Sequence, residues 1–218
     1  MSVWAIVAAA GRGDRLGLDR PKAFAALRGR PLLAESLERL DASEWIDAIV
    51  VAAPEGWEEP SVLLAEELGC SKVSACVTGG PTRAESVRLA LGEVPEDAAV
   101  VLVHDAARPL VTEEVVGRVL EPLGEGWDGV VPGLPVSDTV KRVRDGVVVE
   151  TVARDDLVAV QTPQAFVASV LRGAATGEAN DCAALVERAG GRVKVVPGDP
   201  RLLKVTDAID LELVASWL

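Results

Sequence analysis

Residues Val3–Lys22 read VWAIVAAAGRGDRLGLDRPK, and the rest of the chain is organised around this stretch. It opens with an uninterrupted apolar run, Val3–Ala10, which is typical of a strand buried on both faces of a sheet. Three glycines follow the run, at Gly11, Gly13 and Gly17. Glycine lets the backbone turn sharply and lets a ligand approach main-chain N–H groups without a Cβ in the way. The stretch therefore predicts a strand that ends in a glycine-rich, ligand-facing turn.

The cations of the same turn include Arg15 and Lys22. Cationic side chains beside a row of backbone N–H donors make a suitable site for a polyphosphate. The turn matches neither of two common phosphate-binding loops. No Gly-Lys-Ser/Thr follows at Walker spacing, and Leu16 stands where the dinucleotide fingerprint needs its third glycine. The alternative is an ordinary strand-to-helix turn with surface cations, and this stretch alone does not separate the two.

Apolar strands alternate with amphipathic helices along the remaining chain, which predicts an α/β fold with a Rossmann-like, mostly parallel sheet covered on both faces. The predicted strands are Val3–Ala10, Ala48–Ala53, Lys72–Val77, Val100–Val103 (broken by His104-Asp105), Gly129–Pro132 and Arg192–Val196. The predicted helices are Pro31–Leu40, Pro60–Leu68, Thr82–Leu91, Glu113–Leu123, Phe166–Ala175, Asp181–Ala189 and Asp207–Leu218.

Residues 135–160 depart from this alternation. Two β-branched runs, Thr139–Val143 and Val147–Val152, flank Asp145-Gly146, and an Asp-Gly pair in that setting predicts a β-hairpin. We expect this hairpin to be an arm that protrudes from a single domain spanning residues 1–218. Because an isolated two-stranded hairpin is only marginally stable, the arm is expected to pack on a second copy of the chain, giving a homodimer.

Composition limits the classes of function that the chain can have. Its 22 basic and 34 acidic residues give a net charge of −12, which argues against general binding to nucleic acid. No membrane-spanning segment or signal peptide is predicted. The three cysteines have no metal-type or redox-type spacing, so we expect them to be reduced in a cytoplasmic protein.

Polar and charged side chains gather where the predicted strands end. In an open α/β sheet, ligands bind outside the carboxyl ends of the strands, all at one edge. Because cations are not required by turn chemistry, their recurrence at several strand ends favours an anion site over ordinary turns. The clusters are Gly11, Gly13, Arg15 and Lys22; Gly79, Gly80, Arg83 and Ser86; Asp105, Ala106, Ala107 and Arg108; and Lys204 with Thr206.

Together these residues resemble a known family. The chain is similar to 2-C-methyl-D-erythritol 4-phosphate cytidylyltransferases over essentially its whole length. The pieces that carry the resemblance are Ala9–Arg15 (AAGRGDR), Pro21-Lys22, Gly79-Gly80 with Arg83 and Ser86-Val87, His104–Pro109 (HDAARP), Asp138–Lys141 (DTVK) and Thr162–Gln164 (TPQ). The HDAARP and TPQ pieces are much more specific than the glycine-rich turn.

The resemblance implies a nucleotidyltransferase that moves CMP from CTP to methylerythritol phosphate, releases pyrophosphate and uses Mg²⁺. The attacking phosphate oxygen is already ionised near neutral pH, so no general base is needed. This agrees with a chain that has a single histidine, His104, which we interpret as structural. Catalysis then consists of positioning two anions and neutralising charge at the α-phosphorus.

The resemblance also assigns roles to individual residues. It implies that Arg15, Lys22, Arg154 and Lys204 are catalytic. The positions that resemble contacts to CTP are Ala9, Ala10, Gly11, Gly13, Gly79, Gly80, Ser86, Asp105 and Ala106. Those that resemble contacts to the polyol phosphate are Arg108, Thr139, Arg154, Thr162 and Lys204, of which Thr139, Arg154 and Thr162 are expected to reach the site from the partner subunit's arm.

Alternatives stay open at two of these positions. Asp105 either orients Mg²⁺–triphosphate or a substrate hydroxyl, or caps the turn that follows it. Arg108 is either a substrate contact or an ion-pair partner. The metal ligands are not predicted, although we expect the triphosphate to hold most of the Mg²⁺, with Asp105 nearby.

The sequence departs from the family pattern at Ala23, Pro81, Asn180, Cys182 and Leu202. None of these departures removes a predicted catalytic cation. Two other functions remain as alternatives. A ribitol 5-phosphate cytidylyltransferase would share the fold and nucleotide motifs, and a regulatory module would bind nucleotide without catalysis. The presence of Arg15, Lys22 and Lys204 argues against the second alternative.

Overall fold

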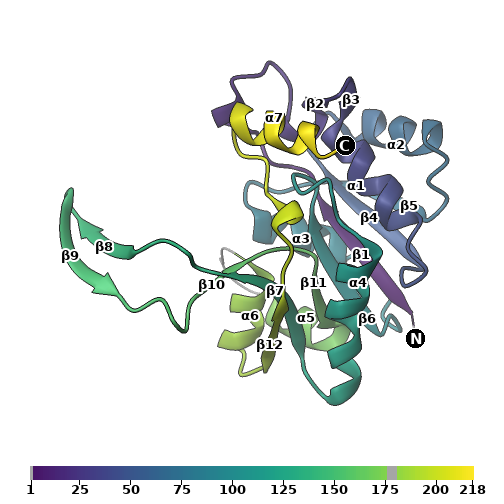
Figure 1. Cartoon of the computed structure of the whole chain (residues 1–218). Coiled ribbons are helices and arrows are strands. Elements are labelled where there is room, and N and C mark those ends of the chain that lie inside the picture. The colour runs from purple at the N-terminus through teal and green to yellow at the C-terminus, as the bar shows by residue number, and fades with distance from the viewer. Residues whose placement is uncertain (1, 176–180) are drawn as a thin grey trace.

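A central sheet of eight strands organises the computed structural model, which describes residues 2–175 and 181–218 (Figure 1). Its spatial order is β10 (Val158–Val160), β7 (Gly129–Pro135), β11 (Gln164–Val167), β6 (Val100–Asp105), β1 (Val3–Ala8), β4 (Ala48–Ala53) and β5 (Val73–Thr78), and β12 (Val193–Pro197) also pairs with β7. Strand β1 runs parallel to both of its neighbours, and β12 runs parallel to β7. Only β10 and β11 pair antiparallel within this sheet, so the predicted mostly parallel α/β fold is confirmed.

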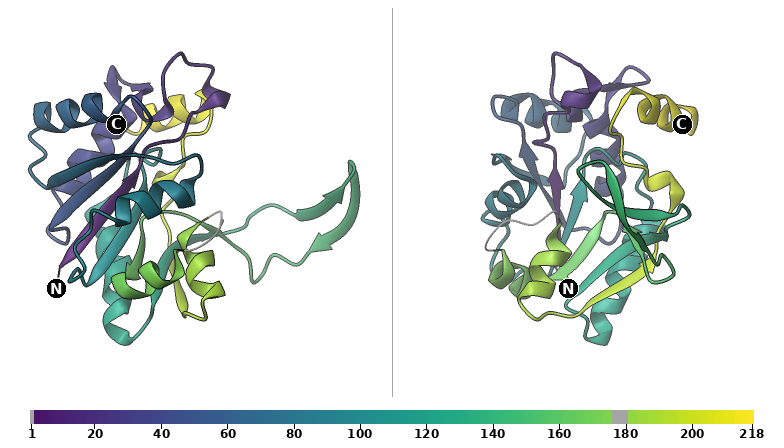
Figure 2. Two further views of the ribbon diagram at one scale, coloured as in Figure 1. Left: turned by 180° about the vertical axis from the view of Figure 1, so that it is seen from behind. Right: turned by 90° about the vertical axis from the view of Figure 1, so that its left-hand side faces the viewer.

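Helices cover both faces of the sheet (Figures 1 and 2). On one face lie α1 (Leu32–Asp41), α2 (Glu58–Glu67) and α4 (Glu113–Leu120); on the other lie α3 (Arg83–Leu91), α5 (Ala168–Ala174) and α6 (Cys182–Arg188). Alternate residues of β1 enter different cores: Val3, Ala5 and Val7 pack with the first set of helices, and Ile6 packs with the second. Burial on both faces explains why β1 has a continuous apolar sequence.

The C-terminal segment crosses back over the N-terminal part of the chain. Helix α7 (Ala208–Ser216) begins with a reciprocal capping box between Asp207 and Asp210, and it packs on a third core that contains Leu27, Leu32 and Leu110. The remaining short elements are β2 (Ala26–Leu27), β3 (Arg30–Pro31) and four 3₁₀ turns: η1 (Asp14–Leu16), η2 (Lys22–Phe24), η3 (Glu121–Glu125) and η4 (Pro200–Leu202). This arrangement brings the segment after η4 beside the N-terminal turn.

The predicted hairpin is present as β8 (Val140–Arg144) and β9 (Val147–Val152), and it projects well away from the sheet (Figure 1). Asp145 and Gly146 both have positive φ at its tip, as the Asp-Gly signal requires. The predicted limits of 135–160 are wider than the paired hairpin, because β10 returns to the main sheet and pairs with β7. The described chain contains no helix long and apolar enough to cross a bilayer.

Several predicted boundaries are wrong. Strand β7 runs to Pro135 rather than Pro132, and α4 ends at Leu120 rather than Leu123. Strand β1 ends at Ala8 rather than Ala10, and β6 continues through His104 to Asp105, where it still pairs with β1. The predicted helix Phe166–Ala175 begins only at Ala168, since Gln164–Val167 forms β11 between β6 and β7.

Candidate active site

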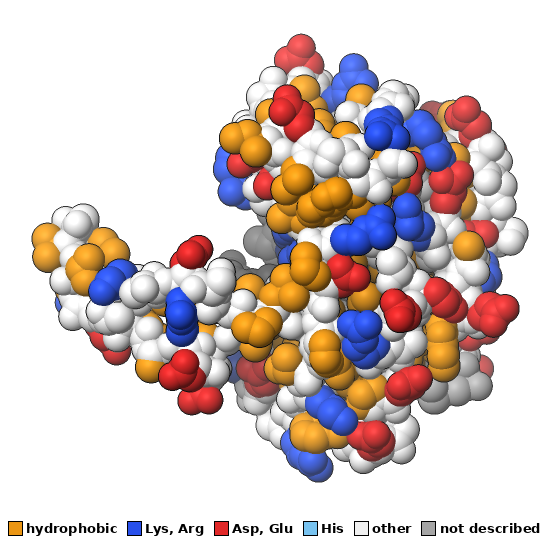
Figure 3. Space-filling view, viewed as in Figure 1, with side chains coloured by type: hydrophobic (Ala, Val, Ile, Leu, Met, Phe, Trp, Pro, Cys, Tyr) orange, Lys and Arg blue, Asp and Glu red, His pale blue; other side chains and the backbone are white. Residues whose placement is uncertain are grey.

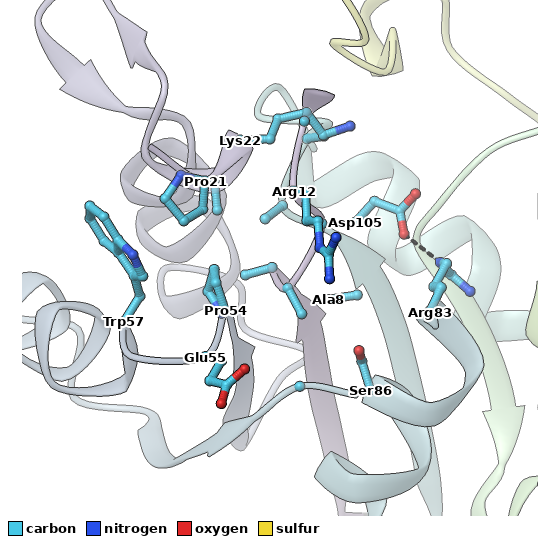
Figure 4. Close-up of a pocket in the computed structure, with 18 of the residues that line it drawn as sticks. Ala8, Arg12, Pro21, Lys22, Pro54, Glu55, Trp57, Arg83, Ser86 and Asp105 are labelled. Atoms are coloured by element: carbon cyan, nitrogen blue, oxygen red, sulfur yellow. Dashed lines mark hydrogen bonds and ion pairs between the residues drawn. The ribbon is translucent and has the colours of Figure 1, made fainter. Parts of the chain in front are cut away.

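A cleft of about 820 Å³ opens at the edge of the sheet where parallel strands end (Figure 4). Its walls are the segments that follow β1, β4, β5 and β6, and Lys204 comes from the segment after η4. Eleven predicted site residues line this cleft: Ala9, Ala10, Gly11, Gly13, Lys22, Gly79, Gly80, Ser86, Asp105, Ala106 and Lys204. The structure therefore brings together residues that are up to about two hundred positions apart in the sequence.

Lys22 lies at the top of the cleft and donates a hydrogen bond of 3.2 Å from Nζ to the Val205 carbonyl oxygen. Burial lowers its pKa, and the nearby charges of Lys204, Arg15 and Arg108 lower it further, while Asp105 acts in the opposite direction. A crowded cation of this kind gains from the arrival of an anion, which relieves the repulsion. The environment of Lys22 is therefore suited to a phosphate ligand.

Asp105 joins two cations at the centre of the cleft. Its Oδ1 accepts a 2.7 Å hydrogen bond from Arg83 Nε, and its Oδ2 accepts one of 2.6 Å from Lys204 Nζ. Burial alone would raise the pKa of Asp105, but Arg83 and Lys204 outweigh burial and hold that pKa well below its usual range. The carboxylate is thus ionised at neutral pH and shared between the two cations.

A narrow part of the cleft is built from small residues. A Cβ on Gly79 would lie 2.3 Å from the Cβ of Ala10, so only glycine fits beside β1 at this position. Ser86 Oγ accepts from the Gly80 N–H at 3.1 Å and lies 2.9 Å from the Thr82 carbonyl oxygen, to which it donates. The Thr82 hydroxyl in turn caps α3 by accepting from the Glu85 N–H. These contacts hold the Gly79-Gly80 turn open as a rigid wall.

The backbone of Asp105 is also held in place by hydrogen bonds. Its N–H donates to Thr162 Oγ1 at 3.0 Å, and that hydroxyl lies 3.3 Å from His104 Nδ1. His104 Nε2 lies 3.0 Å from the Arg108 carbonyl oxygen, which can only accept, so the proton of the neutral ring is on Nε2. Nδ1 then accepts from Thr162. This chain of bonds makes His104 a structural residue, as we interpret it from the sequence.

The burial of His104 predicts a pH-dependent loss of stability. Burial lowers its pKa to about 4, from an ordinary value of 6.5. The unfolded chain therefore takes up a proton near pH 6.5 and the folded chain does not. The contribution of neutral His104 to the free energy of unfolding is complete above pH 6.5 and is lost as the pH falls towards 4. The linkage amounts to about 3 kcal/mol. In urea unfolding between pH 7 and pH 4.5, we expect His104→Gln to show a shallower pH dependence than the wild type; equal slopes would contradict the assignment.

Three predicted cations, Arg15, Arg108 and Arg154, are not among the residues that line the cleft. Arg15 lies on η1, close enough to Lys22 and Asp210 for its charge to affect the pKa of each. Arg108 donates from Nη1 to the Leu202 carbonyl oxygen at 2.5 Å, just before the segment that carries Lys204. Among the described residues Arg108 forms no ion pair, and its contact with substrate stays a prediction. The bond to Leu202 anchors the segment that carries Lys204.

The three residues predicted to act from the arm lie in two different places. Thr139 and Arg154 flank the paired hairpin on its sheet-proximal side, and Arg154 donates to the Ser137 carbonyl oxygen. The predicted arm position of Thr162 is wrong. It is buried beside Asp105 in the same protomer, because the chain has already rejoined the sheet at β10.

Several charged or aromatic residues that line the cleft were not among the predicted site residues, including Arg12, Arg20, Glu55 and Trp57. Arg12 lies in the glycine-rich turn, and its guanidinium points into the cleft (Figure 4). Glu55 and Trp57 follow β4, so applying the strand-end rule to Ala48–Ala53 would have found them. Trp57 also packs on Phe24, with ring centroids 4.5 Å apart, which ties this wall to η2 beside Lys22.

The departures from the family pattern have different surroundings. Pro81 and Ala23 both line the cleft, and Ala23 and Leu202 are buried in the core. Cys182 is buried at the start of α6, and its sulfur lies 3.6 Å from Arg83 Nη1. Asn180 lies outside the described residues.

The chain is similar to known members of one enzyme family. The model of the 2-C-methyl-D-erythritol 4-phosphate cytidylyltransferase family matches residues 3–218. A curated enzyme of that name from Saccharopolyspora erythraea is 47% identical, with all of both chains covered.

Solved structures agree with the sequence match. The enzyme from Francisella tularensis superposes with a TM-score of 0.84 at 29% identity, covering 100% of this chain and 99% of that one. The enzyme from Thermus thermophilus superposes with a TM-score of 0.79 at 33% identity, covering 100% and 98%. The fold, the cleft and these matches agree: the chain belongs to the 2-C-methyl-D-erythritol 4-phosphate cytidylyltransferase family.

Proposed function

We propose that the cleft transfers CMP from CTP to 2-C-methyl-D-erythritol 4-phosphate, giving 4-diphosphocytidyl-2-C-methyl-D-erythritol and pyrophosphate in isoprenoid precursor biosynthesis. The observation that carries the proposal is the meeting of Lys22 and Lys204 in one cleft of a chain of this family. The protein as a whole has a net charge of −12, so these local cations are what makes an anionic pair of substrates acceptable there.

In the proposed reaction, a phosphate oxygen of the polyol phosphate attacks the α-phosphorus of CTP. A bond forms between that oxygen and phosphorus, and the bond to the oxygen bridging the α- and β-phosphates breaks as pyrophosphate leaves. Lys22 and Lys204 would stabilise the charge that develops at the five-coordinate phosphorus. No proton has to be removed from the nucleophile, which fits a cleft whose nearby histidine is buried and neutral.

The CTP is expected to extend along the walls that the chain makes from small residues. Ala9, Ala10, Gly79, Gly80 and Ser86 would take the cytidine, because small side chains there leave space for a flat pyrimidine beside main-chain groups. Because Gly79 and Ala10 approach each other closely, we expect this part of the cleft to favour a pyrimidine over the larger purine. Gly11, Gly13 and Ala106 would lie along the ribose and phosphates.

Mg²⁺ is the expected cofactor, and the residues present fit a metal carried mainly by the triphosphate. The described residues contain no group of three or more histidine, cysteine, aspartate or glutamate side chains able to hold a metal. Asp105 offers one ionised carboxylate in the cleft, and Mg²⁺ commonly combines one or two carboxylates with substrate phosphates and water. Bound there, the ion would offset phosphate charge while Lys22 and Lys204 orient the reacting groups.

The arm supports a homodimer. Its exposed valines are Val143, Val147, Val148 and Val149. Val158, Val160 and Val195 are also exposed, and Figure 3 shows a second group of hydrophobic side chains near the base of the arm. Val147 is 65% exposed, which is costly for a lone hairpin in water. A partner subunit that covers this surface would also receive Thr139 and Arg154 near its own cleft.

A cytoplasmic location is part of the proposal. Cys70, Cys76 and Cys182 all carry free thiols. Burial raises the pKa of both Cys70 and Cys76 to about 11, so both stay protonated at neutral pH and are poor partners for disulfide exchange. Free cysteines of this kind suit a reducing compartment.

The deciding experiment measures pyrophosphate release with each of CTP, UTP, ATP and GTP against each polyol phosphate, in the presence of Mg²⁺. We expect release with CTP and methylerythritol phosphate, and little with the other pairs. A clear preference for ribitol 5-phosphate would show that methylerythritol phosphate is not the acceptor substrate. If the protein binds CTP tightly but releases no pyrophosphate with any pair of substrates, it is a nucleotide-binding module rather than an enzyme.

A further inference from the structure

Asp105 divides its two carboxylate oxygens between cations of different kinds. Arg83 holds Oδ1 at 2.7 Å, and its side chain is 20% exposed. Lys204 holds Oδ2 at 2.6 Å, and its side chain is 38% exposed. The Asp105 side chain is 7% exposed. Both cations line the cleft, and the carboxylate links the less exposed one, Arg83, to the more exposed one, Lys204.

Arg83 is fixed more firmly than Lys204. It occupies the first turn of α3, directly after the Thr82 cap, and its Nη1 donates to the Cys182 sulfur at the start of α6 at 3.6 Å. Its Nη2 is buried without a hydrogen-bond partner, so the guanidinium stays in this position despite an unsatisfied group. The bond to Asp105 Oδ1 is what offsets that cost.

Lys204, by contrast, has a long flexible side chain, and within the described part of the chain its amine donates only to Asp105 Oδ2. Its position in the cleft thus depends on where that oxygen is. The Asp105 backbone is held by Thr162, but a carboxylate can still rotate about its own side-chain bonds. Arg83 removes that freedom by taking the other oxygen through a directional N–H bond.

We propose that Arg83 is a positioning residue for the transfer reaction: it orients Asp105 so that Oδ2 holds the Lys204 amine where the incoming phosphate must bind. The inference rests on the proposed function, since it concerns the binding of the polyol phosphate. Arg83 acts through Asp105 and Lys204 rather than by touching the substrate. A purely structural ion pair between α3 and β6 is the competing explanation.

The two explanations differ in which kinetic constant changes. If Arg83 positions Lys204, Arg83→Met raises KM for methylerythritol phosphate by about 10- to 100-fold and changes KM for CTP by less than about threefold. Arg83→Lys keeps the charge and restores part of the loss, although it lacks the fixed fork of N–H groups. The matched control is Arg88→Met on the same helix, where the arginine pairs with Glu85 at the surface.

A double-mutant cycle gives the sharper test. Because Arg83 is proposed to act only through Lys204, adding Arg83→Met to Lys204→Met should change kcat/KM for the polyol phosphate by less than about threefold. A structural role would instead reduce kcat/KM by the full single-mutant factor in both backgrounds. Should the double variant fail to fold, as judged by circular dichroism, the cycle is run with Arg83→Lys in place of Arg83→Met.

Each outcome decides something. Non-additivity with a selective rise in the acceptor KM supports the proposal. Additive losses, or equal rises in both KM values, overturn it and leave Arg83 as a structural residue. If neither the wild-type protein nor Arg88→Met turns over any polyol phosphate, the proposed function is wrong, and this inference is wrong with it.

Discussion

Lys22→Ala is expected to lower kcat for pyrophosphate release by about 10²- to 10³-fold, the loss typical of removing one group that stabilises charge in a transition state. Lys22 lies in the cleft with Lys204 and Asp105, and its lowered pKa reflects burial and the surrounding cations. An alanine there leaves the developing charge on the phosphorus with one cation fewer in a partly buried site, where charge interactions are strong.

The fold should survive this substitution. The hydrogen bond of Lys22 Nζ to the Val205 carbonyl oxygen is replaceable by water at the mouth of the cleft. The tight approach of Gly13 is to the Cβ and backbone of Lys22, which alanine keeps. Thermal unfolding of Lys22→Ala should therefore resemble that of the wild type.

Lys72→Ala is the matched control, because Lys72 also donates from Nζ to a backbone carbonyl, that of Ser43, at 2.6 Å. Lys72 lies before β5 and is not among the residues that line the cleft. We expect turnover of Lys72→Ala to stay within about twofold of the wild type, as for a surface substitution away from the site. Near-normal turnover of Lys22→Ala, or an equal loss in both variants, would count against a catalytic role for Lys22.

The sequence predicts those parts of the fold whose signal is local. Strand β4, Ala48–Ala53, was placed correctly because a strand buried on both faces must be apolar throughout. Strand β11 was missed because its pairing partners lie on β6 and β7, far away in the chain. The sequence of Gln164–Val167 has no local pattern that indicates this pairing. The end of β6 was missed for a related reason: polar His104 and Asp105 remain paired with β1.

The cleft follows the same division. Residues directly after strands were predicted from one rule, since parallel strands end at a common edge. The Arg83–Asp105–Lys204 link was not predicted, because it joins side chains 22 and 99 positions apart whose rotamers only packing decides. Thr162 was assigned to the arm because the resemblance does not say where the chain returns to the sheet. The pairing of β10 with β7 shows that the chain returns before Thr162.

Mixing two inactive variants is expected to restore activity. If Arg154 acts from the partner subunit's arm, Arg154→Ala inactivates the neighbouring cleft, whereas Lys22→Ala inactivates its own. A heterodimer of the two then contains one cleft with both defects and one cleft with neither. Turnover per subunit should therefore reach about half of the wild-type level in the isolated heterodimer, and about a quarter in a randomly paired mixture.

The basis for action in trans is the position of Arg154. It follows β9 on a hairpin that extends away from the sheet, and it is not among the residues that line the cleft of its own protomer (Figure 1). The exposed valines of the hairpin supply the surface on which a second copy would pack. An Arg154 that acted within its own protomer would instead require the arm to fold back across β10.

A mixture of Lys22→Ala with Lys204→Ala is the matched control, because Lys22 and Lys204 line the same cleft of one protomer. Every cleft in that mixture carries one defect whichever subunits pair, so no activity should return. The variants are co-expressed with different affinity tags, and the heterodimer is isolated through both before pyrophosphate release is measured. If activity returns in the first mixture and not in the control, Arg154 acts across the interface. If neither mixture is active, Arg154 acts within its own subunit. If the two tagged chains never co-purify, the protein is not a dimer.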